Sequence, residues 1–285
     1  MIKLNKIKIF TDSTSDLSKE LIEQNNISII PLHIHFNDEE YKDNVDLTQE
    51  ELYKKVEEYN ILPKTSAPSP QEFIEAFRPY IEKGYDIIYI GLSSKMSATI
   101  QNALIAKSEF PSANIEVVDS YNLSSGIGLL VMKACDFREQ GLNLQEIAKE
   151  LRKLVPKVRS SFIIDTLDYL HKGGRCSSVA NFVGGILKIK PVVAVADGEM
   201  FLSHKIRGKR KKVIDTMLKE SLKNKNKMDE KRVFITHSQG GDAVNYLKEE
   251  LERSINVENI HITDAGCVIS SHCGPGTVGI LYIEK

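Results

Sequence analysis

Tryptophan is absent from this chain, and aromatic residues make up only 7% of its 285 residues. Proteins that bind single-stranded nucleic acid gain much of their affinity by stacking bases on aromatic side chains. The charges are also balanced, because 38 Lys and Arg face 39 Asp and Glu, for a net charge of -1. No overall field therefore attracts nucleic acid or an anionic membrane. We expect no nucleic-acid partner.

Long hydrophobic runs are missing as well. No stretch approaches the roughly 20 apolar residues that a membrane-spanning helix needs. Residues 1–10 are basic, but polar residues interrupt the apolar ones, a pattern that predicts a strand and not a signal peptide. The cysteines form no CxxC pair; they are Cys135, Cys176, Cys267 and Cys273. We therefore expect a reduced, cytoplasmic protein without stable membrane insertion.

Motifs for metals and nucleotides are absent too. Cys267 and Cys273 flank His272, but this spacing is not that of a tetrahedral zinc site, so we expect no metal. The phosphate-binding pattern GxxxxGK[ST] does not occur, and no Lys-Ser or Lys-Thr follows the glycine pair at 184–185. We expect no bound cofactor. If the chain takes part in phosphoryl transfer, another protein must hold the ATP.

Predicted strands and helices alternate along the chain, which indicates an α/β fold. The expected strands are residues 7–10, 27–36, 86–92, 115–119, 161–165, 191–196, 200–206, 233–236, 260–263 and 278–283. The expected helices are residues 48–59, 69–84, 97–110, 124–141, 143–158, 177–187 and 242–253, with a basic helix after residue 208. At this length we predict two α/β domains, residues 1–158 and 159–285.

Hydroxyl, cationic and imidazole groups gather at four turns marked by glycine or proline. These turns are residues 65–70, 93–99, 173–175 and 271–276. None of them contains a carboxylate that could act as a base. Donors without a partnering base suit the binding of an anion better than the breaking of a bond.

Each turn also has a plainer interpretation. Ser97 follows a strand and precedes a helix, where its hydroxyl could face a ligand or simply cap the helix. Gly173 and Gly174 before Arg175 could allow close backbone approach, or could end a helix before a surface arginine. His272 could likewise be a solvent-facing loop residue.

A second hypothesis is a serine esterase. The segment around Ser238 nearly matches the GxSxG nucleophile elbow, and Asp264 and His272 follow in the order of a catalytic triad. Position 236 is threonine, however, where the strained elbow favours glycine.

The segment 205–212 is strongly basic. It is typical of a solvated helix face, but it could also dock an acidic partner or, through residues 209–212, nucleic acid. The near-neutral total charge argues against nucleic acid, so we expect a protein partner if this run is functional.

Seven short segments together resemble the DegV family of bacterial fatty-acid-binding proteins. The segments are TDSTSDL (11–17), TSAPSP (65–70), LSSKMSAT (92–99), VDS (118–120), YLHKGGR (169–175), KP (190–191) and HCGPG (272–276). This resemblance implies two α/β domains, with one long-chain fatty acid such as palmitate or oleate held between and beneath them. It also implies the binding subunit of a two-component fatty acid kinase, whose separate catalytic subunit brings ATP and forms an acyl phosphate for phospholipid synthesis.

The resemblance also implies which residues bind the ligand. The fatty acid carboxylate would meet Thr65 and Ser97, with Ser66, Arg175 and His272 close by, while the second domain houses the acyl chain. Ala98 departs from the Ser-Gly-Thr pattern of the family, and its methyl group could narrow the approach to the carboxylate. The residues expected to line the acyl chain are Phe162, Ile163, Ile164, Phe182, Val183, Ile186 and Leu187.

Overall fold

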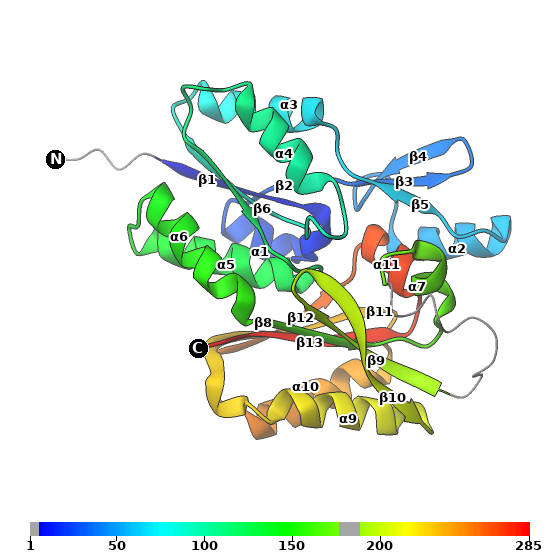
Figure 1. The fold of residues 1–285 in the computed structure, drawn as a ribbon. Coiled ribbons are helices and arrows are strands. Elements are labelled where there is room, and N and C mark those ends of the chain that lie inside the picture. The colour runs from blue at the N-terminus through cyan, green and yellow to red at the C-terminus, as the bar shows by residue number, and fades with distance from the viewer. Residues whose placement is uncertain (1–5, 177–188) are drawn as a thin grey trace.

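A computed structural model describes residues 6–176 and 189–285 (Figure 1). One sheet is parallel and has the strand order β2-β1-β6-β7. Its strands are β1 (Ile7–Asp12), β2 (Ser28–Ile30), β6 (Asp86–Gly91) and β7 (Ile115–Asp119). Side chains alternate between its faces, so that Ile88 and Ile90 pack toward α5 (Ser125–Glu139), whereas Ile87 and Tyr89 belong to a core with α3 (Pro70–Ile81).

A mixed sheet of six strands has the order β10-β9-β8-β13-β11-β12. These strands are β8 (Val158–Ile163), β9 (Ile189–Ala196), β10 (Glu199–Arg207), β11 (Met228–Ser238), β12 (Asn259–Asp264) and β13 (Thr277–Glu284). One face packs on α9 (Arg210–Leu222) and α10 (Asp242–Ser254), through residues such as Ile235 and Ile280. The predicted hairpin is confirmed, because Asp197 and Gly198 join β9 to β10 with positive φ at both residues.

A small antiparallel sheet, β4-β3-β5, was not predicted. It contains β3 (His33–Phe36), β4 (Glu39–Lys42) and β5 (Lys64–Ser66). The single strand expected over 27–36 is wrong, because Pro31 lies between β2 and β3, and these two strands belong to different sheets. Proline cannot donate to a strand ladder, which is why the run breaks there.

The other helices are α1 (Lys19–Gln24), α2 (Gln49–Tyr59), α4 (Thr99–Ser108), α6 (Leu144–Leu154), α7 (Asp168–Gly173) and α11 (Cys267–Cys273), with 3-10 turns at Ser13–Ser15, Val155–Lys157 and Lys225–Lys227. Capping boxes at Thr48 and Ser69 are confirmed. The helix expected to reach residue 158 ends at Leu154, and the strand expected at 161–165 is β8. The helix expected at 177–187 lies outside the described residues.

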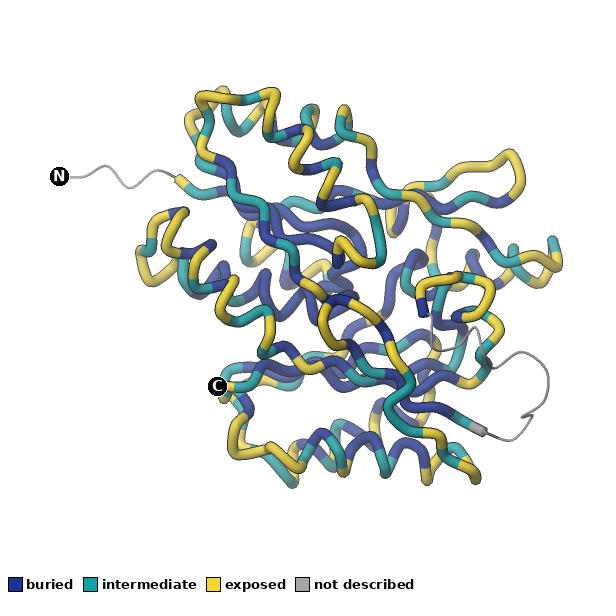
Figure 2. Tube along the Cα trace, viewed as in Figure 1, coloured by how far each residue is buried: buried dark blue, intermediate teal, exposed yellow. Residues whose placement is uncertain are grey.

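Helix α5 lies between the two large sheets (Figure 1) and packs against strands of both. Eleven of its fifteen residues are buried, and Figure 2 shows the buried chain concentrated along this layer. The α/β prediction is confirmed. The parallel sheet uses residues 7–119 and the six-stranded sheet residues 158–284, while the division into domains 1–158 and 159–285 stays a prediction.

Candidate ligand-binding site

A cavity of about 240 Å³ opens where the loop after β6, the small sheet, helix α11 and the six-stranded sheet meet. Ligands in α/β proteins bind beyond the carboxyl ends of strands, and β6, β8 and β11 all end here. Its walls are formed by Leu32, Thr65, Ser66, Ala67, Leu92, Met96, Ser97, Ala98, Leu123, Ser124, Phe162, Leu170, Arg175, Met200, Thr236, His237, Ala265, Val268, Ile269, His272, Cys273, Thr277, Gly279 and Leu281.

Most of this wall is apolar. Phe162, Gly279 and Leu281 supply one side from β8 and β13. A Cβ at position 279 would lie 3.0 Å from the Cβ of Phe162, so glycine leaves room there. Phe162, one of the residues expected to line the acyl chain, lines this cavity, but Ile163 and Ile164 do not. Ile163 turns to the opposite face of β8, toward α9 and α10, because successive side chains of a strand alternate. Residues 182, 183, 186 and 187 lie outside the described residues.

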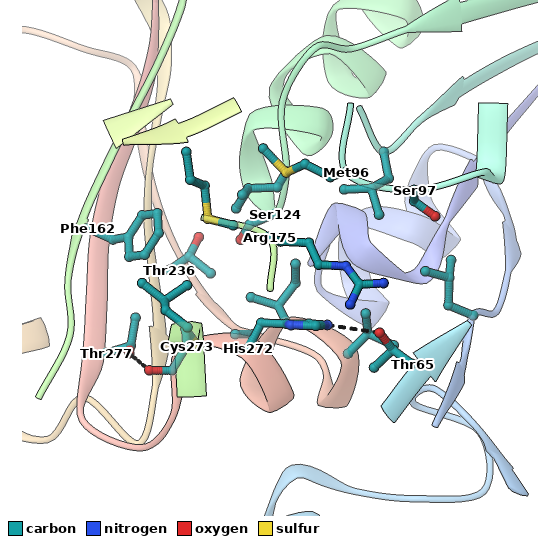
Figure 3. A pocket seen from close by; sticks show the side chains of 18 of the residues that line it. Thr65, Met96, Ser97, Ser124, Phe162, Arg175, Thr236, His272, Cys273 and Thr277 are labelled. Carbon is teal, nitrogen blue, oxygen red and sulfur yellow. Dashed lines mark hydrogen bonds between the residues drawn. The ribbon is translucent and has the colours of Figure 1, made fainter. Parts of the chain in front are cut away.

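The polar end of the cavity is built by Thr65 and His272 (Figure 3). Thr65 Oγ1 lies 2.8 Å from His272 Nε2, although the two residues are 207 positions apart. Thr65 belongs to β5 and not to an irregular turn, and His272 belongs to the last turn of α11 and not to a solvent-facing loop. The structure thus brings together two side chains that the sequence placed in separate turns.

His272 is held neutral at physiological pH. Burial, with a smaller contribution from the nearby Arg175 charge, lowers its pKa to about 4. Its Nδ1 is buried and has no hydrogen-bond partner among the described residues. Gly173 lies against this atom, since a Cβ there would be only 2.3 Å from Nδ1. Glycine at 173 is therefore required for close approach, one of the two alternatives left by the sequence.

Ser97 lies in the cavity wall two residues before α4. The N-cap of α4 is Ala98, so the expectation that the helix opens at Ser97 is wrong. Ser97 Oγ accepts from Thr99 N at 3.3 Å and lies 2.7 Å from Thr99 Oγ1. If the Thr99 hydroxyl donates in that second contact, the Ser97 proton stays free for a ligand. Ala98 has φ -75, which any residue can adopt, so its position does not require glycine.

Arg175 and Ser66 differ in how they meet the cavity. The Arg175 guanidinium points toward the end that carries Ser97 and Thr65 (Figure 3), and its Nη1 donates to Gly173 O at 2.7 Å. Gly174 caps α7 with φ 67, so the helix-end interpretation also holds at that residue. Ser66 lines the cavity, but its Oγ lies 2.8 Å from His35 Nε2, because Thr65 and Ser66 point to opposite sides of β5.

Three buried carboxylates around the cavity were not singled out from the sequence. Asp12 Oδ2 accepts from Leu92 N at 2.9 Å, and Asp16 Oδ1 accepts from Gly266 N at 2.8 Å. Asp43 Oδ1 accepts from Cys267 N at 2.7 Å. Burial raises the pKa of all three, that of Asp43 to about 6. Asp12 and Asp16 belong to the TDSTSDL segment (11–17) of the family resemblance, which was the available signal, and Asp12 caps a 3-10 turn.

The structure does not assemble the alternative triad. Ser238 is fully buried, and its Oγ bonds to Tyr53 OH and, at 2.9 Å, to Ser270 Oγ. His272 Nε2 bonds to Thr65 instead, and Asp264 lies 3.4 Å from His237. An activated serine needs a base within hydrogen-bond reach, so this geometry contradicts the predicted use of Ser238 with Asp264 and His272.

The basic run is divided between β10 and the start of α9. Arg210 faces inward, where it pairs with Asp165 at 2.5 Å and donates to Gly276 O. Lys211 lies over the Tyr246 ring, 3.9 Å from its centre. The run is therefore not a uniform solvated face.

Within residues 6–176 and 189–285, no group of His, Cys, Asp and Glu could hold a metal ion. The Sγ atoms of Cys267 and Cys273 donate to different carbonyls, those of Leu47 and Gly274. No described helix is both long enough and apolar enough to cross a bilayer.

An α/β fold around an apolar cavity with a few polar groups at one end is the usual architecture of a small-molecule-binding protein. Comparison with known proteins supports this class. A family model described as DegV, an uncharacterised protein family, matches residues 6–285. A DegV domain-containing protein of Clostridium acetobutylicum is 39% identical over 285 residues, covering 99% of this chain and 100% of the relative. The chain belongs to the DegV family.

Solved structures of the same fold include proteins described by their ligands. A DegV family protein from Thermus thermophilus, described with fatty acid binding, matches with a TM-score of 0.91 and 32% identity, covering 98% of this chain and 100% of that one. A stearic acid-binding protein from Eubacterium ventriosum matches with a TM-score of 0.88 and 30% identity, covering 98% of both chains.

Proposed function

We propose that this protein binds one long-chain fatty acid in the cavity and presents its carboxylate to a separate ATP-dependent kinase. One observation carries the proposal: Thr65, Ser97, Arg175 and His272 gather at one end of a mostly apolar cavity. That distribution matches a ligand with one anionic end and a long apolar tail. The relatives described as binding fatty acids support the same ligand class.

In this proposal the two hydroxyl groups bind the carboxylate. Neutral His272 donates from Nε2 to Thr65 Oγ1, which leaves the Thr65 proton free to donate to the ligand. Ser97 donates in the same way while Thr99 occupies its lone pairs. Arg175 supplies the positive charge, and Ser66 stays at the rim because His35 holds its hydroxyl. A buried carboxylate without such partners would be costly.

The acyl tail would supply most of the affinity. Burying a sixteen-carbon tail at ~0.8 kcal/mol per methylene gives roughly 11 kcal/mol before losses. Association entropy removes several kcal/mol of this. Each hydrogen bond to the charged head adds about 1.5–3 kcal/mol. The head-group residues therefore mainly orient the ligand and select acids over uncharged lipids.

The kinase belongs to the proposal because the sequence lacks a phosphate-binding loop. We place the exchange in the cytoplasm, and a reducing compartment is supported by the four buried cysteines, none of which is in a disulfide. We assign the carboxylate-binding loops mainly to the first predicted domain and the acyl chain mainly to the second. On this assignment the protein binds and presents its ligand and has no catalytic centre of its own.

Ligand retention tests the binding step. The purified protein is analysed by native mass spectrometry, then extracted for lipid analysis, alongside Thr65→Ala and Ser97→Ala. We expect a fatty acid in the wild-type protein and weaker palmitate retention in both variants. Ser94→Ala, an exposed serine of the same loop, is the matched control. Wild-type protein that binds neither palmitate nor oleate would contradict the ligand class, and wild-type retention in both variants would contradict the head-group assignment.

The surface that docks the kinase is tested by charge reversal in the basic run. Arg210 is unsuitable because it holds Asp165 and Gly276. We expect Lys209→Glu with Lys212→Glu to reduce acyl phosphate formation by a fatty acid kinase subunit, with palmitate retention unchanged. Lys149→Glu with Lys153→Glu on α6 serves as the control. Equal acyl phosphate formation by both double variants would contradict docking at the basic run.

A further inference from the structure

Helix α11 carries His272 in its last turn, and buried carboxylates hold the beginning of the helix. Asp43 Oδ1 accepts from Cys267 N at 2.7 Å and from Val268 N at 3.3 Å. Asp16 Oδ1 accepts from Gly266 N at 2.8 Å. The first N–H groups of a helix have no partner within the helix. Here the N–H groups of Cys267 and Val268, and that of the preceding Gly266, donate to residues more than 200 positions away in the sequence.

We infer that Asp43 and Asp16 are positioning residues for the carboxylate-binding end of the cavity. By fixing the first turn of α11, they set the place of His272 and, through its 2.8 Å contact, the direction of the Thr65 hydroxyl. The seven residues of α11 span only about 10 Å at the usual rise per residue. A tilt at the first turn therefore reaches the His272 ring. This inference rests on the proposed function.

The same two residues also connect α11 to other parts of the cavity wall, Asp16 through its carboxylate and Asp43 through its backbone. Asp16 Oδ2 accepts from Ser124 Oγ at 2.5 Å, and Ser124 lines the cavity. Asp43 N donates to Leu32 O at 2.9 Å, and Leu32 also lines the cavity. Both carboxylates are buried. A buried carboxylate that loses its donors pays a large desolvation cost, so the bonds that these carboxylates accept from α11 and Ser124 resist displacement of the helix.

The test separates head-group recognition from tail burial. Affinities for palmitate and hexadecanol are measured by titration with native mass spectrometry on wild-type protein, Asp43→Ala and Asp16→Ala. The two ligands have the same chain length and differ in the charged head. For each variant we expect palmitate affinity to fall about tenfold and hexadecanol affinity to stay within about twofold. A general loosening of the cavity would instead lower the affinities for palmitate and hexadecanol equally.

Asn at position 43 is the conservative control, because its amide oxygen can accept from the same two N–H groups. We expect Asp43→Asn to keep the wild-type preference for palmitate. Asp136→Asn controls for the loss of a buried carboxylate elsewhere, since Asp136 pairs with Arg232 and Lys231 on β11. It should leave the preference unchanged.

Asp16→Ala removes the acceptor of Gly266 N, whereas Asp43→Ala removes the acceptor of Cys267 N and Val268 N. The Asp16 variant therefore provides a second test if Asp43→Ala does not fold. Folded Asp43→Ala or Asp16→Ala protein with the wild-type preference would overturn the inference, as would an Asp43→Asn protein that loses the preference. Wild-type protein without any preference for palmitate would instead contradict the proposed head-group site. The two failures are therefore distinguishable.

Discussion

Replacing Gly173 by alanine tests the polar end of the cavity without removing any polar group. Gly173 is the last residue of α7, and a Cβ there would lie 2.3 Å from His272 Nδ1 and 3.2 Å from its Cε1. Cβ atoms do not approach other atoms so closely, so the ring must move by roughly 1 Å to restore van der Waals contact. Such a movement would break the 2.8 Å contact between His272 Nε2 and Thr65 Oγ1.

The expected effects on stability and on binding differ. Alanine is favoured over glycine within a helix by up to about 1 kcal/mol. Loss of one hydrogen bond costs about 0.5–1.5 kcal/mol, so the free energy of unfolding should change little. Palmitate binding loses the oriented Thr65 hydroxyl without such compensation. Its affinity should fall about threefold to tenfold, while hexadecanol affinity should change less.

Gly174→Ala provides the matched control. Gly174 has φ 67, and a Cβ there would meet nothing within 4 Å among the described residues. Alanine should cost about 1 kcal/mol of stability through backbone strain and leave His272 in place. Urea unfolding and ligand titration are measured on both variants. Wild-type palmitate affinity in Gly173→Ala, or an equal loss in Gly174→Ala, would refute the assignment of His272 and Thr65 to the head group.

Three further predictions concern stability. The pKa of His272 falls from 6.5 to about 4 on folding. The folded protein should therefore lose up to about 3 kcal/mol of stability as the pH falls from 6.5 toward 4. In His272→Gln the free energy of unfolding, measured with urea, should depend less on pH over this range. The pKa of Asp43 rises from 3.8 to about 6, so its ionisation should remove up to about 3 kcal/mol as the pH rises from 4 to 6. Asp43→Asn should abolish that loss, and an unchanged profile would contradict it. Ser124 has φ 55 and ψ -147, a backbone region nearly restricted to glycine. Ser124→Gly should therefore be more stable than Ser124→Ala by about 1–3 kcal/mol. The reverse order would contradict backbone strain at this residue.

The alternation of strands and helices was predictable because buried parallel strands and amphipathic helices have distinct periodicities. The small sheet was not predictable, since β5 spans only Lys64–Ser66 and gives too short a pattern. Helix α11 was missed because the glycine and proline residues at 274–276 dominate the local signal. The segment before them, Cys267–Cys273, has no capping side chain of its own.

The site was predictable in part. Residue types drew attention to the four turns, and the resemblance to the DegV family implied the five binding residues within them. All five line one cavity: Thr65, Ser66, Ser97, Arg175 and His272. The hydrogen bond between Thr65 and His272 depends on how α11 packs beside β5, which local sequence does not report. The carboxylates Asp16 and Asp43 satisfy donors far along the chain, so only the three-dimensional structure reveals their partners.

Helix α5 has a consequence for how the molecule unfolds. The helix packs against strands of both large sheets. If one sheet unfolded first, the apolar face of α5 that this sheet covers would be exposed to water. Domains separated by a small polar interface can melt one after the other, whereas a shared buried helix couples them. Calorimetry should therefore show a single cooperative transition. Hydrogen exchange should find the α5 amides among the slowest, exchanging only with global opening.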